Sequence, residues 1–286
     1  MKYCITVIFF FLLNLSFSQK VNHRLQKKLE PLIQSHKGVA GVFVFDIKHK
    51  KIISINADSL FPTASMVKVP ILIGIMQKIV SEELQYHQTL TYKDSLLYAG
   101  SDILGSFKND EKIELAKVIM LMLTTSDNTA SLWLQSLAGG GTRINEIIDS
   151  LGFENTRVNS RTVGRENNRT EMGWGQTTPK EMASIFKMIV DENIFSATAS
   201  QQMLKLLSRN YWDEQAVSEI PAGVFVASKN GAVNASRSEV VYVNGNKRRY
   251  IFCVCTKNNT DTSWGNNNEA WLLVKKISAL LWKEMK

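Results

Sequence analysis

Ser65 and Lys68 are three residues apart, a spacing that could support a nucleophilic serine. If a helix begins near Ser65, the two side chains lie on the same face, one turn apart. A serine hydroxyl is a weak nucleophile unless a neighbouring base takes its proton. A lysine can act as that base only when it is neutral, which requires burial or nearby positive charge. The pair alone is common, and a helix start beside a surface lysine is the simpler interpretation.

A second polar segment ends an apolar helical pattern and contains Ser126 and Asn128. In a catalytic site, Ser126 could relay a proton to a leaving nitrogen, and Asn128 could hydrogen-bond a substrate amide. Taken alone, the segment is more typical of a helix end followed by a polar turn.

A third segment, in a strand pattern, begins with Lys229. Lys229 could steady Ser126 and a substrate carboxylate. Gly231 would let a substrate approach the backbone closely, and the N–H groups of Ala232 and Ser65 could form an oxyanion hole. The alternative is an edge strand with a solvated lysine.

The patterns around these segments predict how the chain positions them. Strand-like runs occur near both ends of the chain, and helical periodicity dominates between them. We therefore predict an α+β fold, with one antiparallel sheet flanked by terminal helices and an all-helical lobe. The expected parts are a sheet lobe (19–64 and 208–286), a helical lobe (65–207), and a closing helix at 269–284. Asn244-Gly245 predicts a tight hairpin between the last two strands.

The start of the chain has the features of a secretory signal. A basic start at residues 1–2 precedes an apolar run over 3–15 and the small residues of 16–18. The run is too short to cross a bilayer comfortably. We therefore expect residues 1–18 to be removed, leaving an exported, periplasmic or secreted protein (19–286) without stable membrane insertion, and we expect a monomer.

Composition excludes several other function classes. The formal charge is +8, but the basic residues form no aromatic-interleaved stripe, so we expect no nucleic-acid partner. The 4 histidines show no metal-ligand spacing, and none is expected beside Ser65, which disfavours a Ser-His-Asp triad. We expect no metal and no cofactor. Cys253 and Cys255, two apart in a strand pattern, are expected to be buried core thiols.

The order and spacing of the three segments are more informative than any one of them. Ser65 and Ser126 are 61 residues apart, and Ser126 and Lys229 are 103 apart. With the segment 97–104 and the joints at 156–158 and 177–179, the whole mature chain resembles the class A serine β-lactamases and their penicillin-binding relatives. The resemblance implies ring opening of β-lactams through a Ser65 acyl-enzyme, with Lys68 as base and Ser126 and Lys229 moving protons and holding charge.

The chain departs from this family in the Ω loop, the segment that normally carries a water-activating glutamate. Thr162 stands at the place of that glutamate, and a threonine cannot act as this base. Glu166, one helical turn further on, and Glu171 are the candidate substitutes, with Glu166 preferred. Solvated loop carboxylates remain the alternative for both. The family's loop-closing Arg–Asp ion pair is absent, because Ser160 and Gly175 stand at its positions.

Two further positions bear on substrate binding. Asn230 replaces the family's Thr or Ser, and its amide can still donate a hydrogen bond to a substrate. Arg237 matches an arginine that in many members helps to bind the substrate carboxylate; an exposed strand arginine is the alternative.

The resulting prediction is a serine β-lactamase with slow deacylation, acting on a small β-lactam or a peptidoglycan-derived substrate. The competing hypotheses are a cell-wall D,D-peptidase or esterase and a β-lactam sensor that stays acylated. No sensor domain or anchor is apparent in the sequence.

Overall fold

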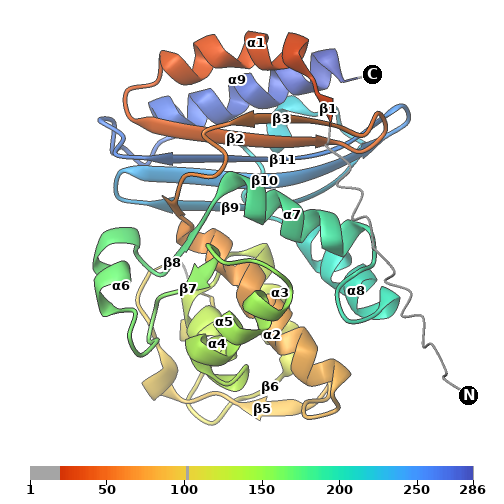
Figure 1. The fold of residues 1–286 in the computed structure, drawn as a ribbon. Coiled ribbons are helices and arrows are strands. Elements are labelled where there is room, and N and C mark those ends of the chain that lie inside the picture. The colour runs from red at the N-terminus through yellow and green to blue at the C-terminus, as the bar shows by residue number, and fades with distance from the viewer. Residues whose placement is uncertain (1–19, 101–102, 286) are drawn as a thin grey trace, which may run out of the picture.

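The computed structural model describes residues 20–100 and 103–285. The predicted signal peptide, residues 1–18, lies outside this range. Two layers are visible: a twisted sheet covered by two helices on one face, and a mainly helical layer on the other face (Figure 1).

The main sheet joins strands from both ends of the chain, as predicted. Its order is β1-β3-β2-β11-β10-β9, and every pair is antiparallel except β1 with β3. The bounds are β1 Lys20–Val21, β2 Val39–Asp46, β3 Lys51–Ile55, β9 Phe225–Val233, β10 Ser236–Gly245 and β11 Arg248–Lys257. The predicted α+β fold class is confirmed.

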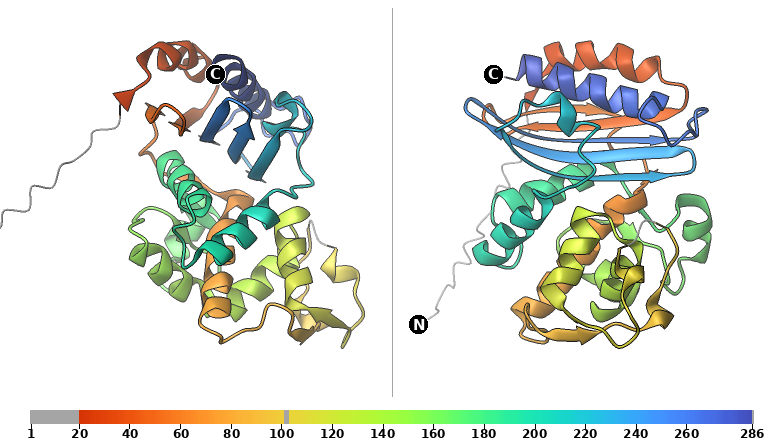
Figure 2. Two further views of the ribbon diagram at one scale, coloured as in Figure 1. Left: turned by 90° about the vertical axis from the view of Figure 1, so that its right-hand side faces the viewer. Right: turned by 180° about the vertical axis from the view of Figure 1, so that it is seen from behind.

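The terminal helices α1 (His23–Gln34) and α9 (Glu269–Glu284) lie side by side on the outer face of the sheet (Figures 1 and 2). Their buried residues, such as Leu29 and Val274, pack with alternate strand residues, such as Val42, into one core cluster. Burial of these apolar stripes is the main free-energy source for docking both helices.

The inner face of the sheet packs against α7, which joins it to the helical layer. The helices here are α2 Lys68–Val80, α3 Leu115–Thr124, α4 Asn128–Leu137, α5 Gly140–Ser150, α6 Glu166–Met172, α7 Pro179–Val190 and α8 Ala197–Leu207. Shorter elements are β4 Phe61–Pro62, η1 Ala64–Val67, β5 Thr89–Thr91, η2 Asp94–Leu96, η3 Leu104–Ser106, β6 Lys112–Glu114, β7 Arg157–Val158, β8 Gly175–Thr177 and η4 Val217–Glu219.

The predicted bounds of the closing helix agree with the structure, whereas the predicted position of the last hairpin turn does not. The closing helix spans the predicted residues. The β10–β11 hairpin exists, but Asn244 and Gly245 are still paired with Arg249 and Arg248, so the two-residue loop is 246–247. The prediction of a turn at Asn244-Gly245 is therefore wrong by two residues, because strand pairing continues through a sequence that could also turn. In the described ranges, no helix combines the length and apolarity needed to cross a bilayer.

Candidate active site

Ser65 lies at the point where the chain leaves the sheet and enters the helical layer. The 3₁₀ helix η1 contains Ser65, and α2 begins at Lys68. In a 3₁₀ helix, residues three apart eclipse one another, so Ser65 and Lys68 point the same way. Pro70 falls in the first turn of α2, where the absence of an N–H is tolerated. Ala64, just before the serine, has a φ of +44°, which is a strained conformation for a residue with a Cβ atom.

Lys68 is fully buried, and its ammonium position is fixed by four oxygen atoms. Its Nζ lies 3.1 Å from Ser65 Oγ, 3.0 Å from Ser126 Oγ, 2.6 Å from the Ser126 carbonyl oxygen and 2.9 Å from Asn128 Oδ1. Burial, and then the positive charge of Lys229, hold the pKa of Lys68 well below its ordinary value, while Asp127 opposes the shift. This shift favours the neutral amine that a serine nucleophile requires.

The Ser126 turn is held rigidly beside this lysine. Ser126 has a φ of +61°, so its backbone is in the left-handed region. The buried Asp127 carboxylate caps α4 by accepting from Ala130 N at 2.7 Å and also accepts from Ile103 N and Leu104 N. These bonds over-determine the turn and stabilise its strained conformation.

Strand β9, at the edge of the main sheet, brings Lys229 and Gly231 next to Ser65. A Cβ atom on Gly231 would lie 2.7 Å from Ser65 N and 2.5 Å from the Thr63 carbonyl oxygen, so only glycine permits this approach. Lys229 is fully buried, and its Nζ donates to the Asn230 carbonyl at 2.9 Å. Burial lowers the pKa of Lys229 to about 7, with Glu239 opposing the shift.

A buried carboxylate, Glu239 of β10, was not predicted from the sequence. Its Oε2 accepts from Ala216 N at 2.9 Å, and its Oε1 is buried without a hydrogen-bond partner among the described residues. Burial raises the pKa of Glu239 to about 8, while the Ala216 N–H and Lys229 oppose the rise. One signal for it existed: Glu239 directly precedes four apolar residues, 240–243, in a strand-like run.

A cavity of about 200 Å³ opens at Ser65, next to strand β9. Ser126, Asn230, Gly231 and Ala232 also line it. The remaining lining residues come from the loop before η4 and from the chain around the start of α9: Trp212, Glu214, Gln215, Trp264, Asn266 and Trp271. A candidate nucleophile, a buried base and an open cavity therefore coincide.

A protein-family model described as the beta-lactamase enzyme family matches residues 24–285. The chain belongs to this family. Among curated proteins, the extended-spectrum beta-lactamase PER-1 of Pseudomonas aeruginosa is 23% identical over 279 residues, covering 90% of this chain and 89% of its own. Beta-lactamase VEB-1, also from Pseudomonas aeruginosa, is 21% identical and covers 75% of this chain and 74% of its own.

Solved structures agree on the fold. A penicillin G acyl-enzyme complex of a PBP-A variant superposes with a TM-score of 0.82 at 21% identity, covering 93% of this chain and 97% of that one. A class A beta-lactamase from Mycobacterium abscessus has a TM-score of 0.80 at 20% identity, covering 91% and 98%. The expected β-lactamase-like architecture is thereby confirmed.

Arg237 occupies a different place in this β-lactamase-family chain from the one the resemblance implied. It is fully buried and does not line the cavity at Ser65. Its guanidinium donates to the carbonyls of Asn234, Ser236 and Ser263, the last at 2.6 Å. It also lies against the ring of Trp264, 4.9 Å from the centroid. Arg237 thus ties the loop that carries Trp264 to the sheet through its two Nη groups, while its buried Nε has no hydrogen-bond partner among the described residues.

The Ω loop is closed without the family's ion pair. Ser160 Oγ donates to Gln135 Oε1 at 2.8 Å, and Gln135 Nε2 donates back to the Ser160 carbonyl, so α4 holds the loop through a reciprocal amide–serine contact. Thr162 is buried and points toward α5, where a Cβ on Gly141 would collide with its hydroxyl. Gly175 has no room for a side chain against Val67.

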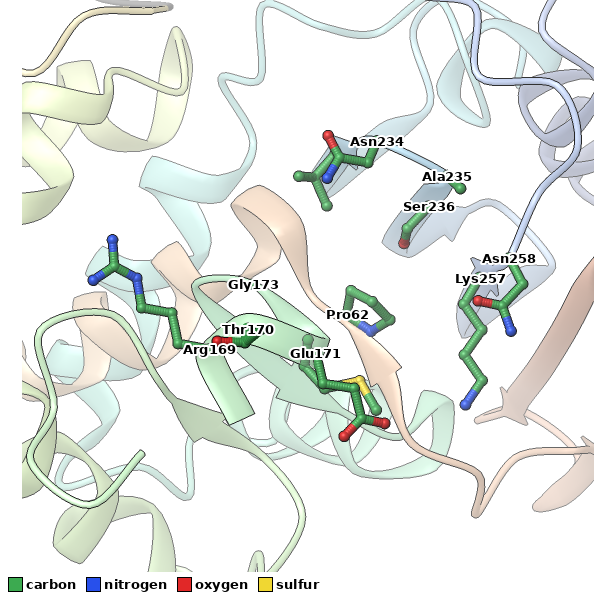
Figure 3. A pocket seen from close by; sticks show the side chains of 12 residues that line it. Pro62, Arg169, Thr170, Glu171, Gly173, Asn234, Ala235, Ser236, Lys257 and Asn258 are labelled. Atoms are coloured by element: carbon green, nitrogen blue, oxygen red, sulfur yellow. The ribbon is translucent and has the colours of Figure 1, made fainter. Parts of the chain in front are cut away.

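Neither candidate carboxylate lies at Ser65. Glu166 begins α6 with an exposed side chain that accepts from Gly164 N at 3.1 Å. Glu171 lines a separate pocket of about 310 Å³ between α6 and the β9–β10 turn, across from Lys257 (Figure 3). Among the described residues, no carboxylate hydrogen-bonds to Ser65 Oγ or Lys68 Nζ.

In the part of the chain that the structure describes, no three or more His, Cys, Asp or Glu side chains are grouped so that they could hold a metal ion. Cys253 and Cys255 are buried and free, with their sulfurs 3.6 Å apart. Burial raises the pKa of the Cys253 thiol, which makes it a poor nucleophile.

Proposed function

We propose that this protein is a serine β-lactamase that opens β-lactam rings through an acyl-enzyme on Ser65. The observation that carries the proposal is the fully buried Lys68 amine, 3.1 Å from Ser65 Oγ and 3.0 Å from Ser126 Oγ. A base in contact with both a nucleophile and a second hydroxyl can take a proton from one and return it through the other.

In acylation, neutral Lys68 accepts the Ser65 proton as Ser65 Oγ bonds to the lactam carbonyl carbon. The resulting oxyanion accepts hydrogen bonds from the N–H groups of Ser65 and Ala232, which the close approach of Gly231 to Ser65 supports. The lactam C–N bond then breaks, and Ser126 delivers a proton to the leaving nitrogen and is reprotonated by Lys68.

Substrate positioning falls to side chains around the same cavity. Asn128 holds Lys68 through its Oδ1 and can present its amide N–H₂ to a substrate carbonyl. Asn230 accepts weakly from Lys229 Nζ at 3.4 Å and donates to the Trp212 carbonyl, so it spans the two sides of the cavity. Lys229 in its charged form would attract the substrate carboxylate.

Deacylation is expected to be slow. A hydrolytic water needs a base near the ester, and Glu166 and Glu171 both lie away from the cavity at Ser65. The assignment of Glu166 as that base remains a sequence-based hypothesis that its exposed position does not favour. We further propose export after removal of residues 1–18 and a monomeric state, which N-terminal sequencing and size-exclusion chromatography with light scattering would test.

Intact-protein mass spectrometry tests the proposal. After addition of a penicillin or a cephalosporin, we expect a mass increase from covalent addition of the opened lactam, absent in the Ser65→Ala variant. An adduct that clears over time supports a β-lactamase, whereas one that persists identifies a β-lactam-binding protein. Absence of any adduct at high ligand concentration would refute the proposed mechanism.

A further inference from the structure

The cavity at Ser65 has one wall made of indole rings. Trp212, Trp264 and Trp271 line it, with exposed fractions of 37%, 69% and 5%. A volume of about 200 Å³ is below the range of ~300–1,000 Å³ typical of sites for whole drug-sized ligands. It fits the reacting centre and one substituent.

This wall adjoins the proposed proton donor to the leaving nitrogen, because the Trp212 indole donates to the carbonyl of Thr125, the residue before Ser126. Ser126, which would protonate the leaving nitrogen, lines the same cavity as Trp212 and Trp264. The pocket lined by Glu171 and by Val233 at the end of β9 shares no lining residue with this cavity. A substituent attached on the leaving-nitrogen side of a substrate therefore extends toward the tryptophans.

Trp212 is fixed in place before any ligand arrives. Its indole N–H donates to the Thr125 carbonyl at 3.0 Å, beside Ser126. Its own carbonyl accepts from Asn210 Nδ2 at 3.1 Å and from Asn230 Nδ2 at 3.3 Å. A ring held on both its side chain and its main chain loses little entropy when a ligand stacks on it.

Trp264 is supported from within the protein. The buried guanidinium of Arg237 lies against its ring and also holds the preceding carbonyl, Ser263 O. Asp261 is the acidic group that acts on Arg237 and partly offsets its charge. The indole is otherwise largely exposed, which leaves ring surface available to a ligand.

The charges facing the cavity favour a cation at its rim. Glu214 lines it with an exposed carboxylate that takes part in no ion pair of the described chain, and Asp213 precedes it. Opposing them are Arg237, whose Nη groups are bound to carbonyls, and Lys229, whose charge is partly lost near neutral pH because burial lowers its pKa to about 7. Indole faces attract cations through the ring quadrupole.

We propose that Trp212, Trp264 and Glu214 form a subsite for a flat, positively charged heteroaromatic ring carried on the leaving-nitrogen side of the β-lactam. The inference deepens the proposed function and rests on it for the orientation of the substrate.

Two cephalosporins with the same thienylacetyl side chain provide the test, one with a 3′-pyridinium group (cephaloridine) and one with a 3′-acetoxy group (cephalothin). We would measure Kd for both by calorimetry on the Ser65→Ala protein, and acylation rates on the active protein. The pyridinium compound should bind at least about fivefold more tightly, as expected for an exposed cation–π contact with a supporting carboxylate.

Two variants distinguish the contribution of the Trp264 ring to binding from that of the Glu214 charge. Trp264→Leu in the Ser65→Ala background should reduce the preference to within about twofold, and Glu214→Gln should reduce it by about two- to threefold. Trp282→Leu is the matched control, since Arg248 lies 4.2 Å from that ring's centroid outside the cavity, and Glu219→Gln is the control for charge.

Equal binding of the two cephalosporins, or a preference that survives Trp264→Leu, would overturn the subsite. A preference for the pyridinium compound on the Ser65→Ala protein without acylation of the active protein would retain the subsite and refute the proposed reaction. Failure of both compounds to bind would overturn both.

Discussion

The Glu239→Gln substitution should stabilise the protein at alkaline pH and have little effect at acidic pH. Glutamine is nearly isosteric and keeps the oxygen that accepts from Ala216 N, but it cannot ionise. Burial raises the pKa of Glu239 to about 8, from an ordinary value of 4.5. Between these two values the unfolded chain has released its proton while the folded chain retains it.

The sign follows from linkage. Below pH 4.5 both states are protonated, so the carboxyl contributes no pH-dependent cost. As the pH rises toward 8, the unfolded state is increasingly favoured, and above 8 the penalty is constant. At about 1.36 kcal/mol per unit, the ceiling of the penalty is ~5 kcal/mol. Lys229 cannot relieve it at high pH, because its own pKa of about 7 leaves it neutral there.

The gain will be smaller than this ceiling, since a buried amide also needs a partner where Glu239 Oε1 has none. We expect Glu239→Gln to raise the free energy of unfolding by about 2 kcal/mol at pH 8.5 and by less than about 0.5 kcal/mol at pH 4.5. Urea unfolding monitored by circular dichroism at both pH values measures the difference, with Glu219→Gln as control. An effect of Glu239→Gln that is the same at both pH values would refute the reasoning.

Three further predictions concern the reaction. Lys68→Met should slow acylation by about 10²–10⁴-fold in time-resolved mass spectrometry, and a loss below tenfold would exclude Lys68 as the base. Gly231→Ala places a Cβ atom against Ser65 N and should reduce acylation by about 10²-fold or more, while Gly245→Ala in the same sheet, whose nearest contact is 3.5 Å, should not. Glu166→Gln should leave the lifetime of the adduct within about twofold of the parent value, and a large increase would reinstate Glu166 as the hydrolytic base.

The parts of the fold that were predictable depend on local patterns. The segment 269–284 has helical periodicity, and α9 spans those residues. The main site residues were predictable for a related reason. Ser65, Ser126 and Lys229 lie in short segments whose residue types and order along the chain indicate a site before any contact is known.

The parts that were not predictable depend on partners distant in sequence. The behaviour of Glu239 depends on burial and on Ala216 N, 23 residues away. The commitment of Arg237 to carbonyl groups depends on the loop at residues 262–263, and the closing of the Ω loop depends on Gln135 meeting Ser160. Residue spacing in the sequence does not predict these contacts, because each one forms between two segments that only the folded structure brings together.

Three buried titratable groups, Lys68, Lys229 and Glu239, affect one another's pKa values. Positive charge on Lys229 favours the neutral form of Lys68, and negative charge on Glu239 favours the charged form of Lys229. Because the pKa of Glu239 is raised to about 8, this carboxyl group is mostly protonated near neutral pH and places no full negative charge near the base. An ionised carboxylate in direct contact with Lys68 would instead keep the base protonated, and Asp127 already acts in that direction. Placing Glu239 behind Lys229, at a cost in stability above neutral pH, is thus compatible with a lysine base, which a carboxylate beside Lys68 would weaken.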